Sequence, residues 1–289
     1  MTDTIPDHLA ALERDGYAVI RGLYTADEMA RLQEATRALY EEGVAHPRSW
    51  RHGNRMFEIN EDPSAGHVLL QAHWFALTHP LFEQFRRHPK LLEVLRPILS
   101  DSINQSTNQI HWKPPGTRYA DYSFHQDAKF VTGVDRNEIA PFLGLQVTTG
   151  LAIERQGRDN GGLSVFPGSH KLGYLGLTDE GEGYIMGGGD QRDELRAVGL
   201  DPEAAVTPEL EAGDMILWTL LTVHGSGANR SETARPLMIN AYTNAILGRG
   251  ETTFVEGRGV PLDPDNLRIR KTERPEPHYL EPTDWMPPQ

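Results

Sequence analysis

Residues 143–153 read LGLQVTTGLAI, and they belong to a series of short apolar or alternating runs that begins after Ser100. Val, Ile, Thr and aromatic residues are frequent in these runs, as they are in β-strands, and Gly, Pro, Asn and Asp separate them. Several short strands with turns between them predict a β-sandwich or barrel. Long helical crossovers are not evident, which argues against a parallel α/β sheet. The expected strands are 105–112, 143–153, 163–166, 215–220 and 237–245.

The first hundred residues have a different pattern and are expected to form a mostly helical flank. Thr25 is a natural N-cap, and Glu28 completes a capping box three residues later. An apolar stripe at helical spacing follows, and Gly43 is expected to end this helix as a C-terminal cap. A further helical region spans 81–99, interrupted where a proline begins a new first turn.

No internal repeat or clear boundary divides the chain, so residues 1–289 are expected to form one domain. Its core would span 101–250, with an insertion at 173–206 and a tail at 251–289. The insertion contains three consecutive glycines and many acidic residues, which is compatible with a lid over a site or with a solvated loop. The tail is rich in proline from Pro261 onward and is expected to lie on the surface without regular structure.

Composition excludes several functional classes. The formal net charge of −13 disfavours nucleic acid as a partner, because an acidic chain repels phosphate backbones. There are no cysteines, so a metal would have to be bound by His and carboxylate side chains. The N-terminal residues do not resemble a signal peptide, and no stretch has the roughly 18 apolar residues of a membrane span. We therefore expect a cytoplasmic protein without membrane contact.

Chemistry is indicated by two separated motifs, FHQD at 124–127 and VHGS at 223–226. Two His and one carboxylate can occupy one face of an Fe(II) octahedron and leave three positions open. Residues i and i+2 of an extended strand point the same way, so His125 and Asp127 can bind one metal while Gln126 points elsewhere. His224 would come from a strand that is distant in sequence but close in space.

The residues after His224 strengthen this interpretation. Ser226 supplies a hydroxyl two residues later, and Arg235 supplies a guanidinium eleven residues later, where the next expected strand begins. A guanidinium fits a carboxylate in a bidentate manner. Arg235 could thus bind the far carboxylate of a keto acid that chelates the metal, and Ser226 could donate to the same group.

The chain resembles the phytanoyl-CoA dioxygenase family. The matching motifs are DGYAVIRGL at 15–23, KPP at 113–115, the FHQD motif, NGGLSVFPGSHK at 160–171, GD at 213–214 and the 224–235 stretch. They occur in the order typical of the family and extend over most of residues 8 to 245. N-G-x-L followed by P-G-S-H-K, together with H-x-D and H-x-S…R, is a specific combination.

The resemblance implies a mainly β fold with flanking helices, in which the core is a double-stranded β-helix (jelly roll, cupin-like). It implies Fe(II) bound by His125, Asp127 and His224, and 2-oxoglutarate bound by Arg235 and Ser226. Gln109 is carried over as a further co-substrate contact, on the basis of some relatives. The implied reaction consumes O2 and 2-oxoglutarate, releases succinate and CO2, and hydroxylates or otherwise oxidises a small molecule.

One departure from the family pattern concerns the substrate pocket. Many relatives have a Trp on the strand before the N-G-x-L block, whereas residues 148–152 here contain none. Halogenating relatives lack the carboxylate ligand, so the presence of Asp127 argues against halogenation. Substrate identity, the outcome of the oxidation and the oligomeric state stay open.

Two other functions remain as alternatives. One is a metal-dependent cupin enzyme that does not use 2-oxoglutarate, and the other is a catalytically silent β-barrel that binds a small molecule. The pairing of Ser226 with Arg235 counts against the first, and the retention of all ligands counts against the second. His111 could face the pocket or a sheet face, His170 is expected to be a structural turn residue, and Trp112 and Tyr242 are expected in the core.

Overall fold

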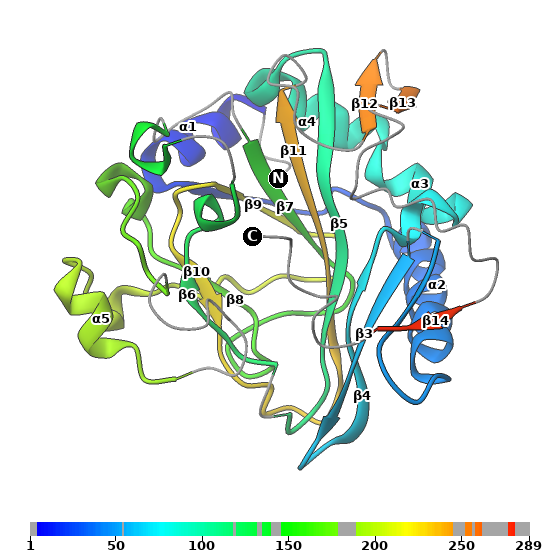
Figure 1. Cartoon of the computed structure of the whole chain (residues 1–289). Coiled ribbons are helices and arrows are strands. Elements are labelled where there is room, and N and C mark those ends of the chain that lie inside the picture. The colour runs from blue at the N-terminus through cyan, green and yellow to red at the C-terminus, as the bar shows by residue number, and fades with distance from the viewer. Residues whose placement is uncertain are drawn as a thin grey trace.

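The computed structural model describes residues 5–53, 55–117, 120–131, 135–139, 146–178, 189–244, 252–255, 258–261 and 277–280. Within these residues the strands form two sheets, one of eleven strands and one of three (Figure 1). Every strand pair is antiparallel. Apolar side chains of the two sheets pack together between them, as Val165 and Trp218 do. The prediction of a mainly β, jelly-roll core with flanking helices is confirmed.

The larger sheet carries most of the described strands, and its centre is the long pair formed by β11 and β5. Along this pair Arg235, the first residue of β11, lies opposite Lys113, the last residue of β5. In spatial order the strands are β1 (Tyr17–Ile20), β9 (Met215–Thr219), β7 (Gln146–Ala152), β11 (Arg235–Asn244), β5 (Ile103–Lys113), β4 (Gly66–His73), β3 (Arg55–Asp62), β2 (Trp50–His52) and β14 (His278–Tyr279), with β12 (Thr252–Val255) and β13 (Arg258–Pro261) as a hairpin on β5.

The smaller sheet contains β6 (Tyr122–His125), β10 (His224–Ser226) and β8 (Leu163–Val165), with β10 in the middle. Residues 143–145 and 245, at the ends of two expected strands, lie outside the described residues.

Helices cover the outer face of the larger sheet, whereas α5 lies on the side of the smaller sheet (Figure 1). The predicted capping box of α2 is present, because the Thr25 side chain accepts from the Glu28 amide while the Glu28 carboxylate accepts from the Thr25 amide. The helices are α1 (Ile5–Asp15), α2 (Ala26–Val44), α3 (Pro80–Arg86), α4 (Pro89–Leu99) and α5 (Arg192–Ala197), with 3-10 turns η1 (Phe75–Leu77), η2 (Asp127–Phe130), η3 (Arg136–Glu138), η4 (Ser169–Leu172) and η5 (Pro202–Ala204).

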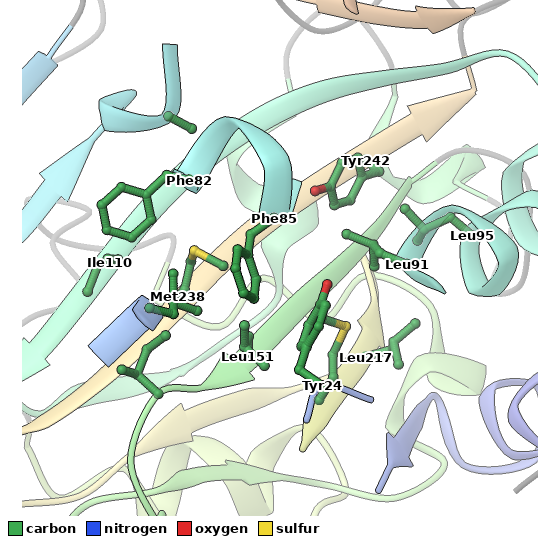
Figure 2. Close-up of a cluster of buried hydrophobic side chains, with 14 of the residues drawn as sticks. Tyr24, Phe82, Phe85, Leu91, Leu95, Ile110, Leu151, Leu217, Met238 and Tyr242 are labelled. Carbon is green, nitrogen blue, oxygen red and sulfur yellow. The ribbon is translucent and has the colours of Figure 1, made fainter. Parts of the chain in front are cut away.

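The main hydrophobic core lies between this helical layer and the larger sheet (Figure 2). Alternate residues of each strand point into it, as Ile110 on β5 and Met238 on β11 do, because side chains alternate between the two faces of a strand. Trp112 and Tyr242 belong to this core as expected, and the Tyr242 hydroxyl donates to the Arg86 carbonyl. The residues that alternate with these core residues along each strand therefore face the other side of the larger sheet, toward the smaller sheet.

Three predictions about the flanks need correction. The helical flank also contains strands that the sequence did not indicate, because β2, β3 and β4 extend the larger sheet beyond β5. Gly43 lies inside α2 and not at its end, since α2 continues to Val44; a Cβ on Gly43 would come within 2.6 Å of Leu69. The tail is not without regular structure, because β12, β13 and β14 all pair within the larger sheet. β12 and β14 pair with strands that are remote in sequence, namely β5 and β2.

No helix among the described residues is long and apolar enough to span a membrane.

Candidate active site

The two predicted histidine ligands come together on the smaller sheet. His125, the last residue of β6, is paired with His224, the first residue of β10. Asp127 follows through an extended Gln126 and begins η2, so it lies just beyond the strand on which we expected it. Its Oδ1 is 3.4 Å from His224 Nε2 and 3.8 Å from His125 Nε2. One donor atom from each residue lies within 4.8 Å of the others, a grouping that could hold a metal ion.

Backbone carbonyls fix the orientation of both imidazoles. His125 Nδ1 donates to the Ser123 carbonyl at 2.7 Å, and His224 Nδ1 donates to the Thr222 carbonyl at 2.9 Å. A carbonyl can only accept, so the proton of each neutral ring lies on Nδ1. Each Nε2 therefore faces Asp127, which is the ring orientation found in metal-binding histidines.

Burial and mutual charge set the protonation of this group. Burial, assisted by the charge of His224, lowers the pKa of His125 to about 3, so this ring is neutral. Burial would raise the pKa of Asp127, but the charge of His224 and hydrogen bonds from His224 and Thr148 hold it below its usual range. Burial would lower the pKa of His224, and the neighbouring Asp127 carboxylate raises it overall. The carboxylate is thus ionised and ready to accept a cation.

Two residues that the sequence did not indicate hold the second oxygen of Asp127. Thr148 Oγ1 on β7 and Trp218 Nε1 on β9 each donate to Asp127 Oδ2 at 2.9 Å. Thr148 and Trp218 are register partners in the larger sheet. The Trp218 ring fits against Gly150, where a Cβ would be 3.1 Å from its Cζ3 atom. The indole thus comes from β9, and Gly150 on the neighbouring strand β7 leaves room for it.

Two buried basic residues form the other end of the site. Arg235 is 2% exposed and Lys113 is fully buried, and they face each other across β11 and β5. Lys113 Nζ donates to the Ser226 carbonyl at 3.1 Å and to the Gly227 carbonyl, and it lies 3.8 Å from Asp121. Burial, and then the charge of Arg235, hold the pKa of Lys113 well below its ordinary range.

Arg235 lacks an anionic partner. Its Nη2 donates to the Gly161 carbonyl, whereas its buried Nε has no hydrogen-bond acceptor. Among the described residues, no carboxylate forms an ion pair with it. Burial lowers the pKa of Arg235 to about 10, so it still carries its charge at neutral pH. A buried guanidinium with a spare donor is a binding site for a carboxylate.

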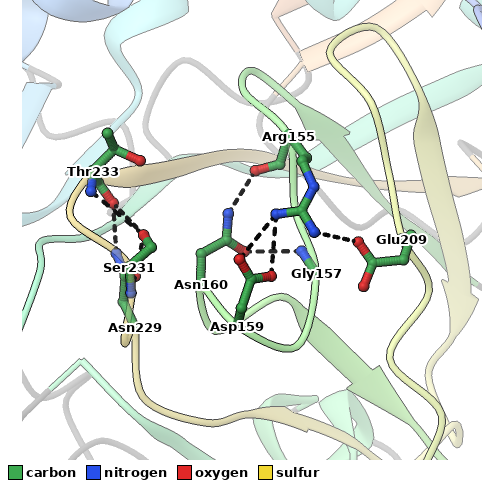
Figure 3. A network of polar contacts seen from close by, with 8 residues as sticks. All are labelled: Arg155, Gly157, Asp159, Asn160, Glu209, Asn229, Ser231 and Thr233. Atoms are coloured by element: carbon green, nitrogen blue, oxygen red, sulfur yellow. Dashed lines mark hydrogen bonds and ion pairs between the residues drawn. The ribbon is translucent and has the colours of Figure 1, made fainter.

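The N-G-G-L motif begins at Asn160, which organises a loop closed by side-chain hydrogen bonds (Figure 3), and the Gly161 carbonyl of this motif accepts from Arg235. The Asn160 side chain accepts from the Gly157 amide and donates to the Arg155 carbonyl, both at 2.8 Å, which closes the loop. Arg155 in turn forms ion pairs with Asp159 and Glu209. Gly161 then adopts a φ of +71°, and a Cβ there would lie 2.5 Å from the Gly227 carbonyl oxygen. Only glycine suits this position.

Asn229 organises the matching turn before Arg235. Its side-chain nitrogen donates to the backbone carbonyls of Lys113 and Thr233. Its side-chain oxygen accepts from the backbone amide and the hydroxyl of Ser231 (Figure 3). An isolated bridge joins Asn229 to Asn160. The two loops therefore support each other, and together they position the co-substrate end of the site.

Gln109 lies on the inner face of β5, on the same face as His111 and Lys113. Its amide is placed between His73 Nδ1 at 3.0 Å and His111 Nε2 at 2.9 Å. His111 stacks on the Tyr122 ring, with centroids 5.2 Å apart, and therefore faces the interior. Burial lowers the pKa of His73 to about 3 and that of His111 well below its usual value, so both rings are neutral. These residues form an uncharged polar wall on β4 and β5.

The segment that follows residue 173 is anchored to the H-x-D motif at both described ends. The side-chain nitrogen of Gln126 donates to the backbone carbonyls of Gly173 and Leu221, and its side-chain oxygen accepts from the Leu175 backbone amide. The Gln126 side chain therefore points away from the candidate metal ligands, as expected. At the far end the Gln191 side chain bonds both the amide and the carbonyl of Phe124. Residues 179–188, which contain two of the three consecutive glycines, lie outside the described residues.

His170 is a structural residue, as expected. It lies in η4, where its Nε2 bonds the Glu13 carbonyl of α1 at 3.1 Å.

Comparisons with known proteins agree with this geometry. The model of a family described as phytanoyl-CoA dioxygenase matches residues 12–237. A probable alpha-ketoglutarate-dependent hypophosphite dioxygenase from Stutzerimonas stutzeri is 25% identical over 254 residues, which are 85% of this chain and 84% of that protein. The ectoine dioxygenase of Sphingopyxis alaskensis is 27% identical over 254 residues, or 85% of this chain and 77% of that protein.

Solved structures share the fold. The structure of EctD from S. alaskensis with 2-oxoglutarate and 5-hydroxyectoine has a TM-score of 0.63 at 22% identity, covering 83% of this chain and 76% of that chain. The non-heme alpha ketoglutarate dependent epimerase SnoN from nogalamycin biosynthesis has a TM-score of 0.59 at 21% identity, covering 86% of this chain and 84% of that chain.

Proposed function

The chain belongs to the phytanoyl-CoA dioxygenase family, and from that premise we propose that it is an Fe(II)- and 2-oxoglutarate-dependent dioxygenase that oxidises a small molecule. The observation that carries the proposal is the convergence of His125 Nε2, His224 Nε2 and Asp127 Oδ1. Two imidazoles and one carboxylate on one side of a metal are typical of non-haem Fe(II) oxygenases.

The side chains of the site are already oriented for a metal. Both histidines direct Nδ1–H to a backbone carbonyl, so each Nε2 faces Asp127, and a bound metal would replace the proton that His224 shares with Asp127. Asp127 is ionised and uses one oxygen for its protein partners, which leaves Oδ1 for the cation. Fe(II), 2-oxoglutarate and O2 would together supply the oxidising chemistry, with release of succinate and CO2.

The co-substrate end fits a dicarboxylate. Arg235 offers an unpartnered Nε, and Ser226 follows His224 by two residues on β10. Both are buried, so a carboxylate bound there would be shielded from water, where a charge-assisted hydrogen bond is stronger. Lys113 donates to the Ser226 and Gly227 carbonyls and so fixes the backbone that follows Ser226. We propose that Arg235 and Ser226 orient the far carboxylate of 2-oxoglutarate.

The substrate side of the site favours a small polar molecule over a long apolar chain. His73, Gln109 and His111 present neutral hydrogen-bonding groups, and these side chains are only partly buried. His111 lies two residues before Lys113 on the inner face of β5 and stacks on Tyr122, the first residue of the strand that ends at His125. Gln109 is already engaged by both histidines, so we assign it to this wall as well as to the co-substrate contact inferred from relatives.

The direct test of the metal and co-substrate sites needs no substrate. The metal-free protein is mixed anaerobically with Fe(II), and 2-oxoglutarate is titrated while the visible metal-to-ligand charge-transfer band is recorded. We expect a saturable band that is absent in Asp127→Ala and unchanged in Asp135→Ala, which removes an exposed carboxylate that caps η3. Bound iron without a band in the wild-type protein would overturn the keto-acid assignment in favour of a metal-dependent cupin enzyme.

The substrate class is tested by succinate release. Wild-type protein loaded with Fe(II) and 2-oxoglutarate is offered a panel of small polar molecules and a panel of long-chain acyl-CoA thioesters. We expect stimulation by members of the polar panel, and loss of that stimulation in Gln109→Leu. Stimulation by the thioesters alone would contradict the assignment of the wall.

A further inference from the structure

The most constrained atom of the site outside the three metal donors is the second oxygen of Asp127. Two neutral donors, Thr148 Oγ1 and Trp218 Nε1, each lie 2.9 Å from Oδ2. A carboxylate with one oxygen doubly hydrogen-bonded keeps only its other oxygen for a metal, so it can bind as a single-atom ligand. The residue pair thus decides which oxygen of Asp127 faces the two histidines.

The origin of these donors matters because it joins two separate sheets. His125 and His224 belong to the smaller sheet, whereas Thr148 and Trp218 are neighbours on β7 and β9 of the larger sheet. Asp127 itself lies in a 3-10 turn and has no strand partner to fix it. Its position relative to the histidines is therefore set by hydrogen bonds to the opposite sheet.

Trp218 contacts two of the three metal ligands. Besides its bond to Asp127, its ring lies against His224, with centroids 5.2 Å apart and planes inclined by 49°. The ring has room there because Gly150 on the adjacent strand lacks a Cβ, which would contact the indole at 3.1 Å. Thr148 donates to the same Asp127 oxygen from β7, whereas Trp218 donates from β9. The loss of one of these hydrogen bonds is therefore not compensated by the other.

We propose that Thr148 and Trp218 are positioning residues that clamp Asp127 Oδ2 and so hold Oδ1 in place as a single-atom metal ligand. The inference rests on the proposed metal site and goes beyond it, because neither residue touches the metal. Outer-shell partners of metal ligands typically contribute about 10–100-fold to metal affinity. The clamp should therefore be visible in metal binding itself, without any turnover.

The experiment measures Mn(II) binding to the metal-free protein by isothermal titration calorimetry. Thr148→Val removes one donor at nearly constant volume, and Trp218→Phe removes the other while keeping an aromatic ring beside His224. We expect each single variant to bind Mn(II) several-fold more weakly, and the double variant about 10–100-fold more weakly. Thr148→Ser, which restores a hydroxyl, should recover most of the loss.

A matched control lies one residue along the same strand. Thr149 is fully buried and donates to the Asn240 carbonyl at 3.1 Å on the other face of β7. Thr149→Val therefore makes the same chemical change away from Asp127 and should leave Mn(II) affinity within about twofold. Melting temperatures of the metal-free variants report any general loss of folding.

A second readout separates positioning from stability. Co(II) bound in place of iron has visible absorption bands that respond to the number and geometry of its ligands. If the freed carboxylate rotates to bind through both oxygens, these bands should change in the double variant and not in Thr149→Val. Double-variant protein that binds Mn(II) within about twofold of wild type, with an unchanged Co(II) spectrum, would overturn the clamp. Failure of wild-type protein to bind Mn(II) would instead remove the metal site, and the clamp with it.

Discussion

The two ends of the candidate site differ in how complete they are. At the metal end, the Nδ1 atoms of His125 and His224 and the Oδ2 atom of Asp127 all have protein partners. At the co-substrate end, Arg235 keeps a buried Nε without an acceptor. A buried cation without an anion is unfavourable, whereas a hydrogen-bonded ligand set is not. The proposed metal end is therefore organised in advance, whereas the proposed co-substrate end would need an anionic ligand to pair Arg235.

This difference separates what each end contributes to stability from what it contributes to binding. Residues at the metal end should support both the fold and the metal. Arg235 should support binding of the co-substrate at the expense of stability, as is common for functional sites.

The largest effect is expected for His125→Ala. Loss of a metal ligand should weaken Fe(II) or Mn(II) binding by more than the roughly 100-fold typical of outer-shell changes. Titration calorimetry on metal-free protein measures it, with His170→Ala as the control because His170 is a buried histidine that bonds a backbone carbonyl elsewhere. Equal metal affinity in His125→Ala and wild type would remove His125 from the ligand set.

Arg235→Met should separate binding from stability. We expect 2-oxoglutarate affinity, measured from the charge-transfer band, to fall on the order of 100-fold, since losing one partner of a buried charge pair costs about 2–5 kcal/mol. The melting temperature of the metal-free variant should be unchanged or higher, because an unpaired buried charge is gone.

Arg86 provides the opposite case for comparison. It is equally buried, but it has an ion pair with Glu83 and a 2.8 Å hydrogen bond to Gln105. Arg86→Met should lower the melting temperature and leave 2-oxoglutarate affinity unchanged. If Arg235→Met behaves like Arg86→Met, the two buried arginines have the same structural role and the contrast between the two ends fails.

Gly161→Ala tests the loop that reaches Arg235. The positive φ and the contact with the Gly227 carbonyl should destabilise the protein by about 1–3 kcal/mol and weaken 2-oxoglutarate binding without weakening Mn(II) binding. Gly168→Ala has a similar φ of +78° but open space around its Cβ, so it reports the backbone strain alone. Denaturant unfolding of both variants gives the difference. Equal effects of the two variants on 2-oxoglutarate would show that the Gly227 contact is unimportant.

The smallest effect concerns pH and the polar wall. The folded state holds His73 with a pKa of about 3 against an ordinary value of 6.5, so the unfolded chain binds the extra proton between these values. Stability supplied by neutral His73 is therefore complete above pH 6.5 and is lost as the pH falls toward 3. His73→Asn should reduce the loss between pH 6.5 and 5.5 by about 1 kcal/mol, measured by urea unfolding of metal-free protein. Identical slopes in both proteins would show that His73 is not held neutral.

The sequence predicted the local features well. The capping box at Thr25, the central strands and the divergent orientation of Gln126 all depend on neighbouring residues, and all are confirmed. It also predicted that the strand of His224 would lie close in space to His125, and the two residues are paired in the smaller sheet. The assignment of these residues as metal ligands remains a prediction, as do the roles of Arg235, Ser226 and Gln109.

What the sequence missed depends on contacts between distant segments. β2, β3 and β4 are stable as strands because they extend the sheet beyond β5, which no local pattern reveals. Thr148 and Trp218 carry no motif, and each looks like an ordinary strand residue. Their shared target, Asp127, lies 21 residues from one and 91 from the other, so only the register of β7 and β9 brings them together.

The alternation along β5 has an evolutionary consequence. Ile110 and Trp112 pack against the helical layer on one face of β5, whereas Gln109 and His111 face the site on the other. Selection can therefore exchange the residues that face the site for a new substrate while the residues that hold the fold stay unchanged. Substitutions on the inner face of such a strand can change substrate specificity without changing stability. Divergence from relatives should therefore concentrate in the polar wall.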